Sequence, residues 1–208
     1  MKRKIALLII SILTVSVCFA QNDDDRWKKR YINLGFINNT MSREESPDLK
    51  SNDGASFITG RIFYLNKAHG GALRFGIDIT WFDLNYTNYK IKHVTNLGTD
   101  NYQFHQGEVS MHIGPSFTIN PGKKWNIHFY FRYAPSYSVL YAKNAFYGNY
   151  ATYFVGGASI SCGVMGLGFE SRYGDCKYKG LGPNSEEGKS SFSKTKYDGW
   201  KAYLTFRF

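Results

Sequence analysis

The 208-residue sequence contains no apolar run long enough to cross a membrane as a helix. Its longest uncharged, mostly apolar stretch is the 13 residues 5–17, whereas a transmembrane helix needs about 20. Cysteine and proline are scarce, with 3 and 5 residues, and only 20% of the residues are charged. Because 43% of the residues are hydrophobic and 17% aromatic, the chain can order about one domain, which argues against full-length disorder and against a two-domain enzyme.

The first twenty residues have the pattern of a processing signal. Three basic residues at positions 2–4 precede the apolar stretch, and the small residues Cys18 and Ala20 stand three places and one place before Gln21. This order is typical of a secretory signal peptide. We therefore predict a cleaved signal peptide at residues 1–20 and one domain at residues 21–208. Lipidation of Cys18 is the alternative, which the branched Val17 disfavours.

The sequence also lacks a block of basic residues. The formal net charge is +10, and removal of residues 1–20, which hold three basic and no acidic residues, leaves +7. The basic residues are spread through the chain, so we expect no nucleic-acid partner and at most an affinity for anionic membrane surfaces. The five histidines show no spacing with carboxylates or cysteines that a metal requires, so we predict no metal and no other cofactor.

Apolar and polar residues alternate with a period of two along much of the chain, which is the pattern of β-strands. In residues 73–81, the apolar face consists of Leu73, Phe75, Ile77, Ile79 and Trp81. The same alternation occurs in residues 108–117 and 125–133, and more weakly in residues 31–37, 56–65, 149–161, 164–173 and 200–208. The pattern therefore predicts eight strands.

The connectors between these strands alternate in length. Short ones lie near residues 66–71, 120–124 and 162–163, and long polar ones at residues 38–55, 83–102, 135–148 and 174–199. Short turns at one rim and long loops at the other are typical of a transmembrane β-barrel. A soluble β-sandwich would show the same strand alternation. Aromatic residues near the strand ends, Trp81, Trp125, Tyr133 and Trp200, favour the barrel.

The C-terminal residues carry a resemblance to a known family. Residues 200–208 place Trp200, Ala202, Leu204, Phe206 and Phe208 on one face and end on an aromatic residue. This segment resembles the C-terminal β-signal of Gram-negative outer-membrane barrel proteins, and the whole chain resembles the small eight-stranded ones more loosely. The resemblance implies an all-β, eight-stranded antiparallel barrel in the outer membrane, in contact with lipid and lipopolysaccharide. It also implies that the barrel-assembly machinery engages Phe206 and Phe208.

Two further expectations follow from the barrel interpretation. We expect the barrel to be the entire mature protein. Pro115 cannot donate to a strand ladder, and a closed barrel has no edge strand, so we expect a β-bulge at this position.

If the apolar faces contact lipid, the charged faces fill the barrel. The predicted inward-facing residues are Arg61, Arg74, Asp78, Glu108, His112, His128, Arg132, Glu170, Arg172, Lys201 and Arg207. An eight-stranded barrel is only wide enough for side chains to fill it, so we expect these groups to pair and to exclude a water channel. Cys162 and Cys176 would be roughly 46 Å apart along an extended strand, too far for a disulfide.

Glu108, Ser110 and His112 share one face and could be a Ser/His/acid set. Residues two apart on a strand are separated by roughly 6.6 Å, which argues against direct hydrogen bonds and favours a polar plug. Outer-membrane lipid A deacylases and palmitoyltransferases are barrels of this size. Their His and Ser pattern is not evident here, because His105 has outward parity and Ser136 and Ser138 inward parity. We therefore predict no catalytic residue.

The favoured function is a non-enzymatic outer-membrane barrel whose long extracellular loops bind a protein or a glycan, or serve an accessory or structural role. The loops contain Tyr86, Tyr89, Tyr102, Tyr141, Tyr147 and Tyr178, a composition compatible with adaptable recognition. Alternatively, these residues merely extend the hairpins above the membrane. A lipid-modifying enzyme, which would need a polar catalytic group facing lipid at the outer rim, and a small-solute pore remain the alternative functions.

Overall fold

The computed structural model describes residues 27–43, 46–65, 72–95, 98–122, 124–142, 145–181 and 195–208. The predicted signal peptide at residues 1–20, including Cys18, lies outside the described residues. In the described part of the chain there is no helix long and apolar enough to cross a membrane.

In the described residues, nine antiparallel strands form a single sheet: β1 (Arg30–Arg43), β2 (Ser46–Tyr64), β3 (Leu73–Thr95), β4 (Gly98–Gly122), β5 (Trp125–Ala142), β6 (Ala145–Cys162), β7 (Met165–Cys176), β8 (Lys179–Leu181) and β9 (Thr195–Arg207). Sequential strands pair from β1 to β7, β7 pairs with β9, and β9 pairs with β1. The ring therefore closes with eight strands, as the alternation predicted. The short β8 lies outside this ring and pairs with the start of β6 at residues 146–148.

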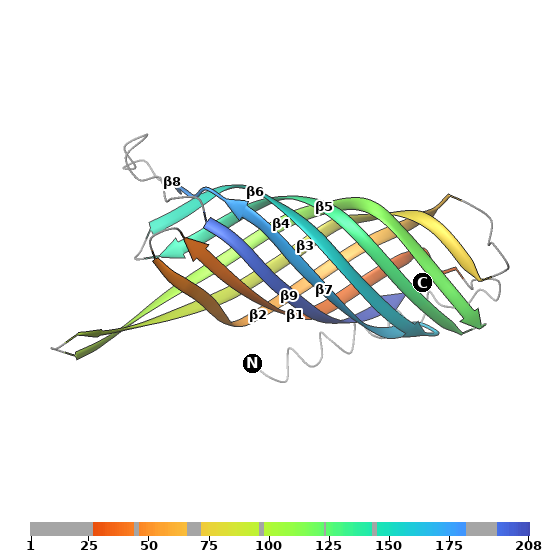
Figure 1. The fold of residues 1–208 in the computed structure, drawn as a ribbon, viewed down its shortest axis with the longest axis horizontal. Helices are drawn as coiled ribbons and strands as arrows, with labels where there is room; N and C mark the ends of the chain where they lie inside the picture. The colour runs from red at the N-terminus through yellow and green to blue at the C-terminus, as the bar shows by residue number, and fades with distance from the viewer. Residues whose placement is uncertain are drawn as a thin grey trace.

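The two ends of the barrel differ (Figure 1). At one end lie the connections β2–β3, β4–β5 and β6–β7 together with the C-terminus, and this is the end that faces the periplasm in barrels of this kind. At the other end the β3–β4 hairpin projects beyond its neighbours. Three of the four connectors predicted as long loops are mostly strand, because β1–β2, β3–β4 and β5–β6 continue pairing almost to their tips. These three segments therefore extend the hairpins.

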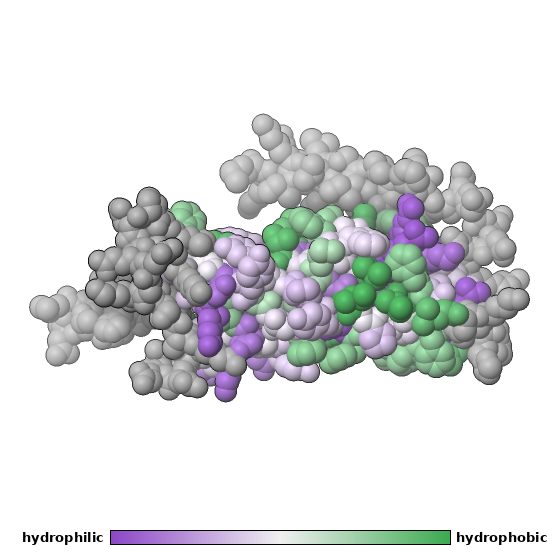
Figure 2. All heavy atoms as spheres, turned by 90° about the horizontal axis from the view of Figure 1, so that it is seen from above, coloured by the Kyte–Doolittle hydropathy of each residue, from purple (hydrophilic) through white to green (hydrophobic). Residues whose placement is uncertain are grey.

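Apolar side chains cover the outside of the ring. The large hydrophobic residues that remain exposed lie on the outward faces of the strands; they include Phe36, Phe75, Trp81, Phe82, Met111, Ile113, Phe117, Trp125, Phe131, Tyr133, Phe154, Ile160, Leu167, Phe169, Trp200 and Leu204. On the face seen in Figure 2, hydrophilic side chains gather toward both ends, and mostly pale or hydrophobic ones lie between them. Such an arrangement places lipid outside and polar groups inside, the reverse of a soluble protein.

A bulge in β3 changes which residues face the interior. Against β4, Thr80 pairs with His112 and Asp83 with Ser110, so Trp81 and Phe82 both lie on the outer wall and Asp83 points inward. Two consecutive outward aromatic residues gain contact with lipid, and the inserted residue shifts the parity of the rest of the strand. The alternation in residues 73–81 gave no sign of this shift.

The bulge predicted at Pro115 is wrong. Pro115 pairs with Ile77 of β3, and the register of β4 against β5 is the same on both sides of it, with Ile113 opposite Tyr133 and Ser116 opposite Tyr130. The missing N–H costs a single ladder bond, while the pairing of β4 with β3 continues through Pro115 without a shift. The irregularity of this strand pair lies instead between Ile119 and Gly122.

Candidate functional site

Charged residues pair with one another inside the barrel. Ten of the eleven predicted inward-facing residues have inward parity, and the largest fully buried side chain is that of Arg132. Arg61 was predicted wrongly, because Ile58, Gly60 and Ile62 form the inner face of β2, and Arg61 therefore points outward, above the ring of Phe63. The inner face of β2 is thus mainly apolar, and the charge of the interior comes from the other strands.

Two cations bridge the middle of the interior. Arg132 on β5 places Nη2 2.7 Å from Glu170 Oε2 and donates through Nη1 to Thr80 Oγ1 at 2.7 Å. Lys201 on β9 lies 2.7 Å from Asp83 Oδ2 and 3.1 Å from Glu170 Oε1. All of these side chains are buried, so each charge depends on its partner. The network spans the lumen and excludes a continuous aqueous path through this level.

The other carboxylates of the interior are also engaged. Glu108 accepts hydrogen bonds from both terminal nitrogens of Arg172, at 2.7 and 2.8 Å. Asp78 accepts from Tyr31 at 2.6 Å and lies 2.9 Å from His128 Nε2. These contacts bear out the expectation that the inward-facing charged groups pair with one another.

The arrangement of Ser110 and His112 does not form a catalytic triad. Ser110 Oγ lies 3.1 Å from His112 Nε2, so the expectation that residues two apart would not bond directly is wrong, because both side chains lean toward each other from the same face of β4. The acid near His112 is Asp83, not Glu108, and it also contacts Nε2, at 3.1 Å. A triad needs the acid and the serine on opposite ring nitrogens. These two residues therefore belong to the plug.

Tyrosines close the outer end of the lumen. Tyr178, between β7 and β8, is fully buried and lies within hydrogen-bond distance of Ser138 (2.8 Å), Gln106 (3.2 Å) and Tyr197 (2.5 Å). Burial, the largest cause, raises the pKa of Tyr178, so its hydroxyl keeps its proton. Tyr89 is buried beside it and donates to Gln106. These two of the six predicted loop tyrosines are thus part of the fold and are not exposed for recognition.

Among the other loop tyrosines whose side chains the structure describes, only Tyr86 is exposed, at 48%. The rings of Tyr86, His105, Tyr141 and Phe146 form a row across the outer wall of β3 to β6, with centroids 6.0, 6.5 and 4.8 Å apart. The Tyr86 hydroxyl also lies 2.7 Å from His105 Nδ1. Tyr147 is partly buried and packs against the cluster that contains Tyr89 and Tyr178. The side chain of Tyr102 lies outside the described residues. The rings in the row contact one another, which indicates cross-strand stabilisation.

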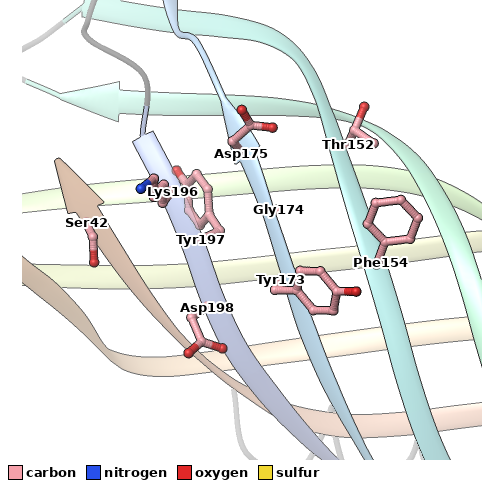
Figure 3. A pocket seen from close by; sticks show the side chains of 9 residues that line it. All are labelled: Ser42, Thr152, Phe154, Tyr173, Gly174, Asp175, Lys196, Tyr197 and Asp198. Carbon is pink, nitrogen blue, oxygen red and sulfur yellow. The ribbon is translucent and has the colours of Figure 1, made fainter. Parts of the chain in front are cut away.

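A groove of about 720 Å³ lies on the outer wall, across β1, β9, β7 and β6 (Figure 3). Its lining consists of Ser42, Thr152, Phe154, Tyr173, Gly174, Asp175, Lys196, Tyr197 and Asp198. The strand register brings these residues together, since Asp175 pairs with Lys196 and Thr152, and Asp198 with Tyr173. We call this site the outer groove.

The outer groove combines an aromatic wall with charged groups. The rings of Phe154 and Tyr173 stack with centroids 5.6 Å apart, and both side chains are outward and exposed. Lys196 and Asp198 on β9 are also exposed on the outer wall. Outward charges are unexpected on the wall of a membrane barrel, because a basic residue at the bilayer midplane costs about 2–4 kcal/mol.

The height of the outer groove explains these charges. From Phe206 at the inner end of β9 to Lys196, the strand rises about 33 Å, or roughly 23 Å along the barrel axis at a tilt of about 45°. The apolar band of such barrels is about 25 Å tall, and a charge at its border costs only about 0–1 kcal/mol. Lys196 therefore lies near the outer border of such a band, whereas Asp198, two residues lower on β9, lies about 5 Å further in, where an acidic residue costs less than a basic one.

The residues of the outer groove were not predicted from the sequence. Lys196, Asp198 and Trp200 share the outward face of β9, so extending the C-terminal alternation two steps further would have flagged two charges on the lipid side. The contribution of Ser42 and Thr152 depends on strand pairing and has no sequence signal. Among the described residues, no group of three or more His, Cys, Asp or Glu side chains is placed to hold a metal ion.

Comparison with known proteins supports the fold. No family model and no curated protein sequence matches the chain. The crystal structure of Neisserial surface protein A is similar, with 12% identity, a TM-score of 0.50, and coverage of 86% of this chain and 97% of that chain. Ail, the attachment invasion locus protein of Yersinia pestis, and the outer membrane enzyme PagL were also matched, with 7% and 9% identity, TM-scores of 0.41 for both, and coverage of 87% and 85% of this chain and 99% of each of those chains.

The closed ring, the apolar exterior and this likeness define the fold of the chain as a small eight-stranded β-barrel of the membrane type. The apolar outer wall agrees with the Gram-negative outer-membrane location that the resemblance of the C-terminal segment implies.

Proposed function

We propose that this protein is a non-enzymatic outer-membrane barrel that binds the saccharide headgroup of an outer-leaflet glycolipid, lipopolysaccharide in type, in the outer groove. The observation that carries the proposal is the outward-facing set of charged residues beside two stacked aromatic rings, toward the outer border of the apolar band. This site refines the expected recognition by the extracellular end, because it is formed by the barrel wall and not by loop tips.

The chemistry of the outer groove suits a sugar. A saccharide ring presents an apolar C–H face and a rim of hydroxyl groups. Phe154 and Tyr173 offer flat apolar faces, Asp198 offers acceptors and Lys196 offers donors. A few placed polar groups on an apolar wall are the general composition of a small-ligand site.

The rest of the barrel favours binding over transport or catalysis. The buried ion pairs of Arg132, Lys201 and Arg172 occupy the lumen, which argues against a pore. None of the described residues that line the outer groove is a histidine, and Ser42 makes no side-chain hydrogen bond in the described part of the chain. An activated serine needs an adjacent base, so the groove favours a binding role over the lipid-modifying alternative.

The proposal is tested by purifying the protein from outer membranes and measuring the lipopolysaccharide that remains bound. We expect Tyr173→Ala and Asp198→Asn to lower retention severalfold, because each removes one side of the headgroup contact. Asp48→Asn, an exposed carboxylate on the β1–β2 hairpin, is the matched control and should leave retention unchanged. Equal retention by all variants would contradict the proposal, and so would a change in lipid A structure that depends on Ser42, since it would indicate an enzyme.

A further inference from the structure

At the periplasmic end of the barrel, basic residues gather without an acidic partner among the described residues. A cavity of about 410 Å³ is lined by Lys29, Arg61, Arg74 and Tyr64, together with the apolar side chains of Ile62, Phe63 and Leu65. We call it the inner-rim pocket. It lies at the opposite end from the outer groove and does not depend on the function proposed there.

The two arginines of the pocket are held in place by aromatic rings. The guanidinium carbon of Arg74 lies 4.4 Å from the centroid of the Trp27 ring and 5.5 Å from that of Tyr64. Trp27 and Tyr64 themselves pack edge to face, 5.6 Å apart. Arg61 lies over Phe63 at 5.1 Å. Cation–π contacts of this kind fix the side chains without neutralising their charge.

The positive charge of the pocket has no counterion within the described residues. No described carboxylate forms an ion pair with Lys29, Arg61 or Arg74. The Nε atoms of both arginines are buried and have no hydrogen-bond partner in that part of the chain. Asp78, on the same strand as Arg74, is committed to Tyr31 and His128. Three cations around one cavity favour an anion with several acceptor oxygens, and a phosphate group meets that need.

The apolar part of the pocket indicates where the phosphate comes from. Phe63 and Leu65 are exposed on the outer wall, Leu65 at 67%, at the inner edge of the apolar band. A phosphate at the three cations would therefore have lipid-facing side chains directly beside it. A free anion gains nothing from an adjacent apolar surface, whereas the acyl chain of a lipid buries apolar area by packing along it.

We infer that the inner-rim pocket binds the phosphodiester headgroup of an anionic phospholipid from the leaflet that faces the periplasm. The phosphate contacts Lys29, Arg61 and Arg74, and the acyl chains lie against Phe63 and Leu65. Because three positive charges meet a single headgroup, a net-negative phospholipid binds in preference to a zwitterionic one.

The test reconstitutes the full-length protein in vesicles of equal parts phosphatidylglycerol and phosphatidylcholine, releases it into detergent, and counts the retained lipids by mass spectrometry. We expect the wild type to retain phosphatidylglycerol in preference. Arg61→Gln/Arg74→Gln should lower that preference by about thirtyfold, since each of the two basic side chains contributes about 1 kcal/mol near an anionic lipid and every 1.4 kcal/mol is tenfold. The matched control is Arg30→Gln/Lys124→Gln, which removes two exposed basic residues of the same rim that do not line the pocket, and it should keep the preference.

Lys29→Gln alters only an exposed side chain, so it tests the site even if the double arginine variant fails to fold, and it should lower the preference severalfold. Equal retention of both lipids by the wild type would overturn the inference, as would a preference that survives all substitutions in the pocket. Competition by soluble glycerol phosphate at the same concentration as the lipid would assign the pocket to a free anion and overturn the lipid assignment.

Discussion

Arg172 and Glu108 form a two-pronged ion pair across the barrel interior, with Nη1–Oε1 and Nη2–Oε2 distances of 2.7 and 2.8 Å. The two residues come from β7 and β4, which are not neighbours in the ring. The pair therefore connects two strands that are separated by β5 and β6 in the ring, and the Arg172 guanidinium also lies over the ring of Tyr153, 4.1 Å from its centroid.

Replacing one residue of this ion pair should destabilise the barrel more than replacing both. Arg172→Met leaves Glu108 charged and buried without its main partner, at an expected cost of about 3–5 kcal/mol in the free energy of unfolding. Arg172→Met/Glu108→Gln should recover a large part of that loss, because no uncompensated charge remains. Urea unfolding in lipid vesicles measures both values. A double variant less stable than the single one would contradict the paired-plug account.

The purified protein should show no steady ion conductance in a planar bilayer. Arg132, Lys201 and Glu170 fill the centre of the lumen, and the Tyr178 cluster fills its outer end. An eight-stranded barrel leaves no further room for a water column. Uniform, long-lived conductance steps from the wild type would show that the interior is not packed as described.

Tyr178 should matter for stability, although it lies in the segment between β7 and β9 that the sequence predicts to be a long polar connector. Tyr178→Ala should cost about 3–5 kcal/mol through the cavity it leaves. Tyr178→Phe keeps the ring and should cost only about 1–2 kcal/mol through the lost hydrogen bonds. Tyr150→Ala is the control, because that side chain is 80% exposed. The unfolding midpoint of each variant is the measurement. Equal midpoints for the three variants would contradict a structural role of Tyr178.

The last strand should be needed for assembly. Phe208 exchanges two backbone hydrogen bonds with Arg30, at 2.9 and 3.0 Å, where β9 closes the ring against β1. The resemblance to the β-signal adds the expectation that assembly factors engage this end. Deleting Phe208 should sharply lower the heat-modifiable form in the outer membrane and raise its degradation products. Unchanged yield after deletion would contradict both roles of the residue.

Much of this fold could be predicted because alternate residues of a membrane-barrel strand face two different environments, the lipid and the barrel interior. His128, Arg132, Glu170 and Arg172 were placed inside from parity alone, and the structure buries all four. Parity failed where the chain departs from a strict period. The bulge at Trp81 and Phe82 moved Asp83 into the interior network, and no local signal predicted it.

Arg61 shows the limit of using charge as a guide to orientation. Its position was inferred from its charge, but the apolar Ile58 and Ile62 fill the inner face of β2, and Arg61 lies at the inner rim, where headgroups accept it. The outer groove was invisible for a different reason. Ser42 and Asp198 belong to neighbouring strands that close the ring from opposite ends of the chain, so their proximity depends on closure and register.

Binding of a sugar by the outer groove can be measured by isothermal titration calorimetry. The protein in phosphatidylcholine nanodiscs is titrated with the deacylated oligosaccharide of lipopolysaccharide, which has no acyl chains to insert into the disc. We expect saturable binding by the wild type and by Lys90→Gln, an exposed lysine on β3 far from the groove along the ring, and an affinity at least about tenfold lower for Lys196→Gln and Tyr173→Ala. No binding by the wild type, or equal affinity in all four proteins, would contradict the account.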